Sequence, residues 1–242
     1  AFSHFDLPQL GVLLANLELN PASVHAPTTG ADISSSNLQE RRIAEQLLID
    51  TIFYCKSIKC PILVVHPNIL GSNSLLLPDD VQRNNCIDSL GKIVDRTQDH
   101  SVKIALENLP DYEGKGRVAS RVVDLIEIIE KVGSQNVGIC VDTGHTNITK
   151  HQNLAKKLKM SLEDEIMQAG KYLCTLHIND NNGKEDIHLV PGDGNIEWAL
   201  VIRSLRQVNY KGIFMMEILE REDSDEQARR SYQKGAELLG IN

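Results

Sequence analysis

The segment YLCTLHINDNNGKEDIHLVPGDGNIEW, residues 172–198, joins an apolar run to a polar loop and then to a helix. The apolar run ends at His177, and the loop after it carries Asp186 and His188 before the turn 191–194. Histidines and carboxylates gathered at the end of a strand have the composition of a metal site or an acid–base site. The same kind of ending recurs along the whole chain.

The 242-residue chain has a globular composition, with 41% hydrophobic and 24% charged residues. This length suits a single domain over residues 1–242 with a sizeable core. No apolar run approaches the roughly 20 residues of a membrane span, and no signal-peptide pattern is present, so we expect a cytoplasmic protein with no membrane partner. The net charge of −8 disfavours a nucleic-acid partner without excluding a local positive patch.

Six apolar runs each end in a side chain that can bind a metal or move a proton. These residues are His25, His66, Glu107, Asp142, His177 and Glu217. They follow one another at intervals of 41, 41, 35, 35 and 40 residues, about the length of one strand, one helix and two loops. The spacing predicts consecutive βα units, and the fully apolar runs predict parallel strands covered on both faces.

The segments between these runs predict the helices. We expect helices over residues 8–18, 38–54, 81–94, 122–129, 161–169 and 196–208, and a last, charged helix that ends at residue 239. The expected strands cover residues 22–25, 61–65, 102–106, 137–141, 172–177 and 212–216. Residues 1–6 could be the tail of another strand.

A doubly wound open sheet and a closed barrel both contain such units. A closed ring brings the carboxyl ends of all its strands to one centre, which suits six strands that end in ligand-type side chains. A dinucleotide-binding sheet would carry G-x-G-x-x-G after a strand, and this chain has none. We therefore predict a (β/α)8 TIM barrel. Two more strands are needed before His25, so we expect the first strand or strands to be lacking in this sequence.

Taken singly, each strand-end residue could be a helix cap or a core residue. Taken together, six titratable side chains in the same phase of consecutive strands favour a shared site. Glu107, Asp142, His177 and Glu217 make a set of three carboxylates and one imidazole. Such a set suits Mn²⁺, Mg²⁺, Co²⁺ or Zn²⁺ rather than a soft metal bound by thiolates.

Several short motifs follow one another in a fixed order. They are Glu107-Asn108, Asp142-x-Gly144-His145, His177-x-Asn179-Asp180, Asp186-x-His188 with Pro191-Gly192-x-Gly194, Trp198 and Tyr210-x-Gly212. With these motifs the chain resembles the xylose isomerase-like TIM barrels from His25 to Glu217. That family comprises the sugar phosphate isomerases and epimerases and the type IV apurinic/apyrimidinic endonucleases.

In the ketose epimerases of this family, four matching residues hold one divalent metal: Glu107, Asp142, His177 and Glu217. The resemblance implies that Glu107 and Glu217 also exchange protons with opposite faces of the substrate, and that His66 and His145 contact substrate oxygens. A metal that polarises a carbonyl and its neighbouring hydroxyl stabilises an enediolate, while a carboxylate removes the α-proton. We therefore predict a metal-dependent isomerase or epimerase of a sugar or sugar phosphate.

In the endonuclease branch, a larger matching set holds three zinc ions. It comprises His25, His66, Glu107, Asp142, His145, His177, Asp186, His188 and Glu217, all of which are present here. Such metals would activate a water and clamp a phosphodiester. The endonucleases also carry a tyrosine shortly after the first histidine, where this chain has residues 26–28, Ala-Pro-Thr. The 25 Lys and Arg against 33 Asp and Glu give no clear phosphate-binding stripe.

Gly183 stands where ketose epimerases carry an arginine, six residues after the metal histidine. The resemblance therefore implies the wider isomerase or epimerase class. A third alternative is a barrel that binds a small polyol without catalysis. Five residues would bind substrate in an isomerase and additional metal in an endonuclease: His25, His66, His145, Asp186 and His188. The sequence names neither the sugar nor the metal, and it leaves a homo-oligomer open.

Overall fold

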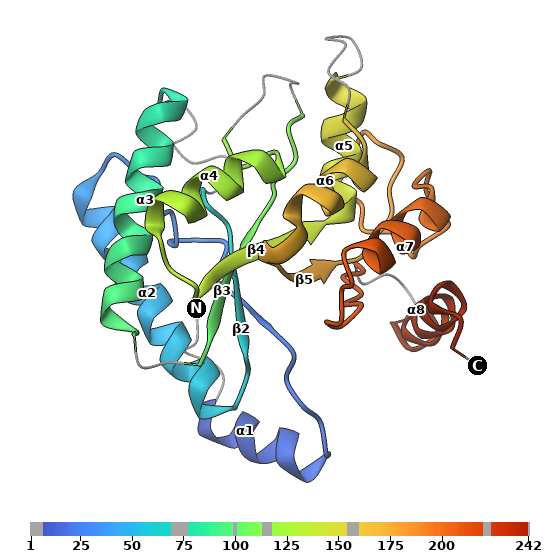
Figure 1. Cartoon of the computed structure of the whole chain (residues 1–242). Helices are drawn as coiled ribbons and strands as arrows, with labels where there is room; N and C mark the ends of the chain where they lie inside the picture. The colour runs from blue at the N-terminus through green and yellow to red at the C-terminus, as the bar shows by residue number, and fades with distance from the viewer. Residues whose placement is uncertain are drawn as a thin grey trace. The chain divides into compact units, whose positions relative to one another are not determined.

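The computed structural model describes residues 7–68, 77–98, 101–112, 118–153, 160–219 and 224–241 (Figure 1). The expected strand tail at residues 1–6 lies outside this range. The chain divides into two compact units. The first unit contains residues 1–107 and 127–138, and the second contains residues 108–126 and 139–242. The prediction of a single domain stays a prediction, and each unit is described by itself.

The first unit alternates helices with parallel strands. Its elements are α1 (Leu7–Asn16), β1 (Val24–His25), α2 (Leu38–Ser57), β2 (Ile62–Val65), α3 (Asp79–Arg96) and β3 (Lys103–Glu107). Strand β2 pairs in parallel with β1 on one side and with β3 on the other. Helices α2 and α3 pack side by side next to these strands (Figure 1). The unit therefore contains consecutive parallel βα repeats, as the spacing predicts.

Local sequence explains the ends of helix α2. Asn37 is the N-cap, and its side-chain oxygen accepts hydrogen bonds from the backbone N–H groups of Gln39 and Glu40. At the other end Lys59 adopts a positive φ of 59°, and the N–H of Cys60 donates to the carbonyl oxygen of Cys55 at 2.8 Å. This left-handed turn closes the helix and leads the chain directly into β2.

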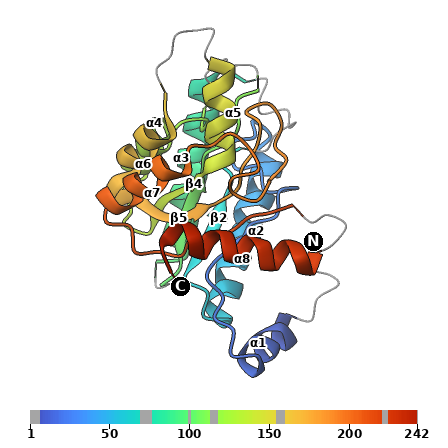
Figure 2. The same cartoon turned by 90° about the vertical axis from the view of Figure 1, so that its right-hand side faces the viewer.

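The second unit continues the same alternation. Its elements are α5 (Thr143–Asn153), α6 (Leu162–Ala169), a 3-10 turn (Gly170–Tyr172), β5 (Leu173–His177), α7 (Trp198–Gln207) and α8 (Ser224–Leu239). Helix α4 (Val122–Val132) and strand β4 (Val137–Asp142) run through both units. Strand β4 pairs in parallel with β5, so that Asp142 lies opposite His177. Helices α6 and α7 lie side by side (Figure 2).

Two elements differ from the sequence prediction. Helix α5 follows β4 directly, although residues 143–153 carry a single large apolar side chain, that of Ile148, and show no amphipathic pattern. The expected strand at 212–216 is reduced to one bridge between Ile178 and Met216. After this bridge the chain contacts the loop that follows β5, where Leu219 N–H donates to the carbonyl oxygen of His188 at 3.2 Å.

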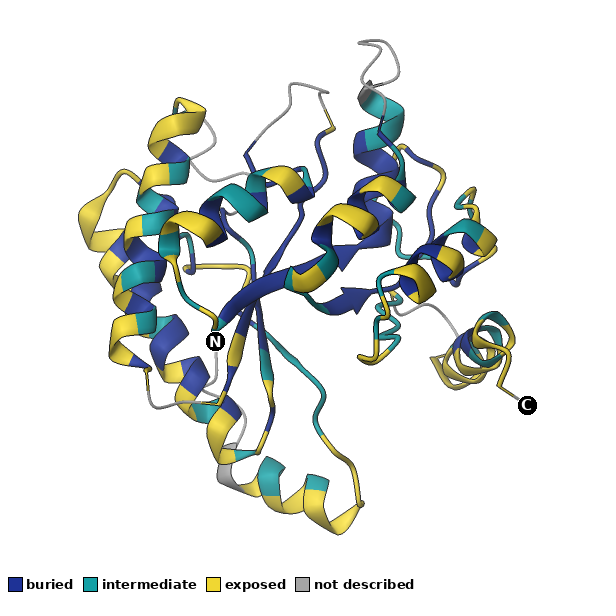
Figure 3. Ribbon diagram, in the orientation of Figure 1, coloured by how far each residue is buried: buried dark blue, intermediate teal, exposed yellow. Residues whose placement is uncertain are grey.

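The buried residues follow the strands, whereas α1 and α8 are largely exposed (Figure 3). All six residues of β4 are buried, as are the last four of β3. Strands with no exposed face are expected where helices cover both sides of a parallel sheet. No helix in the described part of the chain combines the length and apolar character that a membrane span requires.

Candidate functional site

Three strand ends of the first unit bring His25, His66 and Glu107 together, and we call this the first-unit cluster. Nε2 of His25 lies 3.2 Å from Oε2 of Glu107, and Nε2 of His66 lies 3.3 Å from the same oxygen. The two imidazole rings meet edge to face, with centroids 4.8 Å apart. The Glu107 side chain is fully buried. Adjacent parallel strands in register explain why three residues so distant in sequence converge.

Asp142, His177 and Glu217 form a second group, the β4–β5 cluster, within the second unit. Their ligand-type atoms lie within 4.8 Å of one another. Nδ1 of His177 is 3.1 Å from Oε2 of Glu217. Asp142 is fully buried; its Oδ1 accepts from the backbone N–H of His145 at 2.7 Å, and its Oδ2 accepts from Nδ2 of Asn179 at 2.8 Å. These bonds fix the carboxylate and leave it with further lone pairs.

His145, Asp186 and His188 form the loop cluster, also within the second unit. His145 comes from the first turn of α5, and the other two come from the loop after β5. Nε2 of His145 lies 3.1 Å from Oδ2 of Asp186, and Nε2 of His188 lies 3.1 Å from Oδ1. Among the described residues, that buried Oδ1 has no hydrogen-bond partner of normal geometry. The group contains two imidazoles and one carboxylate, which are ligands for zinc and similar divalent metals.

Three of the five histidines in the clusters, His25, His145 and His188, share an orientation that suits a metal, whereas His177 faces Glu217 with its Nδ1. In each of the three, Nδ1 lies close to a backbone carbonyl oxygen. For His25 this is the oxygen of Ala26 at 2.6 Å, for His145 that of Asn108 at 2.8 Å, and for His188 that of Glu217 at 2.8 Å. A carbonyl oxygen only accepts, so each Nδ1 carries the proton. The Nε2 lone pair of a neutral ring would then face a carboxylate oxygen. A cation has to lie there, either a second proton on the ring or a metal ion.

The charges of the loop cluster shift its pKa values strongly. Burial opposes protonation of His188, but its pairing with the Asp186 carboxylate and the nearby carboxylates of Asp142 and Glu217 outweigh it and raise its pKa to about 9. Burial likewise opposes ionisation of Asp186, but the hydrogen bond from His145 and the pairing with His188 outweigh it and lower its pKa. The raised pKa favours the protonated form of His188, and a metal that bound its Nε2 would displace that proton into solvent.

Every residue that the sequence singled out falls in one of these three clusters. Of the nine residues, three belong to the first unit: His25, His66 and Glu107. Six belong to the second unit: Asp142, His145, His177, Asp186, His188 and Glu217. The four-ligand set that joins Glu107 to the β4–β5 cluster draws on both units and stays a prediction.

Supporting residues were not recognised as such from the sequence. The side-chain oxygen of Asn108 accepts a hydrogen bond from the backbone N–H of Asp142 at 2.8 Å. The backbone carbonyl oxygen of Asn108 accepts a hydrogen bond from Nδ1 of His145. The sequence signal for this role of Asn108 was its place directly after Glu107 in the Glu107-Asn108 motif. Tyr112 was missed altogether; burial, together with the charges of Asp186 and Asp142, raises its pKa to about 12.

The surroundings of Gly183 leave little room for a long side chain at this position. Its φ is +76°, and a Cβ added there would lie 2.5 Å from the ring of His151 on α5. An arginine at this position would require His151 to move. The structure thus agrees with the departure from the ketose epimerases that the sequence shows.

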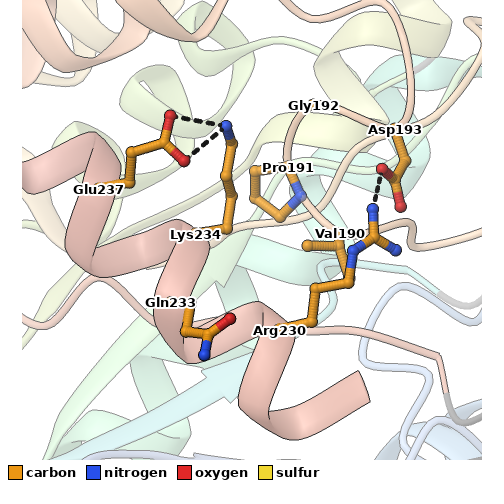
Figure 4. A pocket seen from close by; sticks show the side chains of 8 residues that line it. All are labelled: Val190, Pro191, Gly192, Asp193, Arg230, Gln233, Lys234 and Glu237. Carbon is orange, nitrogen blue, oxygen red and sulfur yellow. Dashed lines mark hydrogen bonds and ion pairs between the residues drawn. The ribbon is translucent and has the colours of Figure 1, made fainter. Parts of the chain in front are cut away.

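A pocket of about 310 Å³ lies between residues 190–193 and helix α8 (Figure 4). Arg230 pairs with Asp193, and Nζ of Lys234 lies 3.0 Å from both carboxylate oxygens of Glu237. Both cations in the lining are thereby neutralised. The pocket contains none of the histidines or carboxylates of the three clusters, so the chemistry belongs to the clusters.

Comparisons with known proteins agree with this arrangement. The chain is 31% identical over 135 residues to a D-psicose 3-epimerase of Enterocloster bolteae, covering 56% of this chain and 40% of that protein. It is 28% identical over 201 residues to a probable endonuclease 4 of Mycoplasmopsis pulmonis, covering 79% and 65%. The chain therefore spans less than two thirds of either relative.

The fold is also found in solved structures. A crystal structure of a D-tagatose 3-epimerase-like protein matches with a TM-score of 0.80 and 26% identity, covering 99% of this chain and 84% of that one. A family model described as xylose isomerase-like TIM barrel matches residues 3–239. Both the predicted barrel and the predicted family are confirmed. The chain belongs to the xylose isomerase-like TIM barrel family.

Proposed function

We propose that the chain is a divalent-metal-dependent isomerase or epimerase that acts on a sugar or sugar phosphate. The observation that carries the proposal is the β4–β5 cluster. Asp142, His177 and Glu217 present two carboxylates and one imidazole whose ligand atoms lie within 4.8 Å of one another. Such a group suits one divalent metal ion. The epimerase relatives support a carbohydrate as the substrate.

The proposed metal ligands are Glu107, Asp142, His177 and Glu217. The last three already present their ligand atoms within 4.8 Å of one another in the second unit. Three carboxylates and one imidazole suit Mn²⁺, Mg²⁺, Co²⁺ or Zn²⁺. When bound, such an ion would polarise the carbonyl and the adjacent hydroxyl of a ketose and so acidify the α-proton.

Glu107 and Glu217 are the proposed proton-transfer residues. One carboxylate removes the α-proton from one face of the sugar, and the other returns a proton to the opposite face. Their surroundings differ, because Glu107 is fully buried between two imidazoles while Glu217 is 35% exposed and contacts His177. His66 and His145 are proposed to contact substrate oxygens.

Proton exchange with solvent tests this proposal directly. The metal-loaded protein, incubated with a panel of ketoses and their phosphates in D₂O, should place deuterium at the α-carbon of at least one. Replacing Glu217 with Gln should abolish the exchange while leaving the fold intact, whereas the matched control Glu226→Gln, on the exposed face of α8, should leave the exchange unchanged. A panel without any incorporation would contradict the isomerase, and would favour a barrel that only binds a polyol.

A zinc phosphodiesterase of the endonuclease type is the second candidate. It is favoured by the first-unit cluster and the loop cluster, each of which could hold a further metal, and by the endonuclease relative. The acidic balance of the chain favours the isomerase instead. Cleavage of an oligonucleotide that contains one abasic site, by protein loaded with zinc, would establish the second candidate and displace the first.

A further inference from the structure

The loop that carries Asp186 and His188 closes around one buried carboxylate, that of Asp180. This side chain has no exposed surface. It accepts hydrogen bonds from four N–H groups: Asn181 N (2.9 Å) and Ile196 N (3.2 Å) on Oδ1, and Gly192 N (2.8 Å) and Trp198 Nε1 (2.8 Å) on Oδ2. All four donors are uncharged, and they come from the beginning and the end of the loop. A carboxylate offers enough lone pairs for all of them, whereas an amide does not.

The main chain of Asp180 holds the middle of the same loop. Its N–H donates to the carbonyl oxygen of Leu189 at 2.8 Å, and the N–H of Leu189 donates back to the carbonyl oxygen of Asp180 at 2.8 Å. This pair of bonds forms an isolated antiparallel bridge. One residue therefore fixes the loop at its start, at position 189 and at its return into α7.

His188, which immediately precedes Leu189, needs such support. Its φ of 41° is unusual for a residue other than glycine. In this conformation its ring reaches the carbonyl oxygen of Glu217 with Nδ1 and Asp186 with Nε2. The backbone bonds of Leu189 with Asp180 and the ring contacts of His188 flank this conformation on both sides.

We propose that Asp180 is a positioning residue that holds Asp186 and His188 in the conformation that builds the loop cluster. It acts through the loop and contacts neither substrate nor metal. The consequence for substrate binding rests on the proposed function: if Asp186 and His188 shape the sugar site, loosening the loop raises KM more than it lowers kcat.

The variant Asp180→Asn tests the claim with almost no change in size. It turns one carboxylate oxygen into an NH₂ group that faces N–H donors. The chain has a single tryptophan, Trp198, so its indole N–H gives one resonance in ¹⁵N NMR spectra. We expect that resonance to move and to exchange at least about tenfold faster. The amides of Gly192 and Ile196 should exchange faster too, while those of Val201 and Ile202 in α7 should not change.

Asp193→Asn is the matched control, because Asp193 lies in the same loop but is partly exposed and pairs with Arg230. It should leave these exchange rates and KM as they are. Unchanged exchange at Gly192 and Ile196 in Asp180→Asn would overturn the proposal. So would a uniform increase over residues 139–219, because that would be a general loss of stability. If Asp180→Asn does not fold, Trp198→Phe removes one donor only: faster exchange at Gly192 supports the proposal, and an unchanged rate overturns it.

Activity provides the second readout. KM for the sugar should rise about tenfold in Asp180→Asn with a smaller change in kcat, and the control should match the unmodified chain. A kcat that falls while KM stays constant would overturn the substrate-binding part. The amide exchange needs no substrate, so a chain that shows the loop effect but has no isomerase activity would refute the proposed function and leave the positioning role standing.

Discussion

The first-unit cluster and the loop cluster contain the same groups, two imidazoles and one carboxylate, but they are built in different ways. In the first unit, β1, β2 and β3 run parallel in register, and each delivers one ligand at its carboxyl end. In the second unit, a helix turn and an irregular loop deliver the ligands. Backbone pairing thus positions one cluster, whereas the backbone carbonyl oxygen of Asn108 and the buried carboxylate of Asp180 position the other.

This difference has a physical consequence. A ladder of parallel strands distributes its stability over many backbone hydrogen bonds and a buried apolar face. A loop anchored on one carboxylate depends on a few bonds whose loss leaves several donors unsatisfied. Substitutions of ligands should therefore act through chemistry in the first unit, and substitutions of supporting residues should act through geometry in the second.

The largest expected effect is that of Glu107→Gln in the first-unit cluster. The neutral amide cannot balance two imidazoles, bind a metal as a carboxylate or accept a proton. Solvent deuterium exchange into a ketose should fall by about 10³-fold or more, and metal affinity measured by calorimetry should fall at least about tenfold. Glu130→Gln, on the exposed face of α4, is the control. Activity within about twofold of the unmodified chain would remove Glu107 from the mechanism.

Metal removal comes next. Chelation should abolish deuterium exchange and lower the thermal midpoint, because a ligand present at about 100 times its Kd contributes about 2.7 kcal/mol to folding stability. Adding back Mn²⁺, Mg²⁺, Co²⁺ or Zn²⁺ singly should restore both, and the most effective ion identifies the preferred metal. Exchange that survives exhaustive chelation would contradict metal-assisted catalysis.

His188→Asn should have an intermediate effect and sharpens the comparison between the two clusters. If the loop cluster only shapes the sugar site, KM should rise about tenfold while the metal content stays constant. His151→Asn is a suitable control, since His151 packs on Gly183 outside the three clusters. A fall in bound zinc in His188→Asn would instead indicate a metal at the loop cluster and favour the phosphodiesterase.

The smallest effect is expected for Gly183→Ala. The positive φ and the close ring of His151 make an added methyl group unfavourable by about 1–2 kcal/mol, which a denaturant titration can measure. Combining it with His151→Ala should recover part of the loss, because the clash is then relieved. A single variant as stable as the unmodified chain would show that the ring moves aside freely.

The sequence predicted the features that depend on spacing and phase. Apolar runs at steady intervals implied parallel βα repeats, and strand-end residues such as Glu107 and Asp142 lie where that pattern indicated. Residues 143–153 were not placed as a helix, because α5 is built from polar residues and lacks the 3.6-residue apolar period. The strand at 212–216 was overestimated, since its apolar residues do not reveal that Leu219 bonds the loop instead.

The candidate site shows the same limit. The candidate metal ligands could be predicted from the sequence, because metal chemistry restricts ligands to a few types of side chain. Supporting contacts were not readable: nothing in the composition of residues 177–198 shows that Asp180 gathers four N–H groups or that His188 adopts a positive φ. Such features depend on how a loop folds back on itself, which spacing alone does not encode.

The most direct test of the central claim is the identity and stoichiometry of the metal in the purified chain. Elemental analysis by mass spectrometry after dialysis should find about one divalent ion of Mn, Mg, Co or Zn per chain, and Asp142→Asn should lose it. A chain that retains no ion and gains none on titration would contradict the account. About three zinc ions per chain would contradict the isomerase and establish the larger ligand set of a phosphodiesterase.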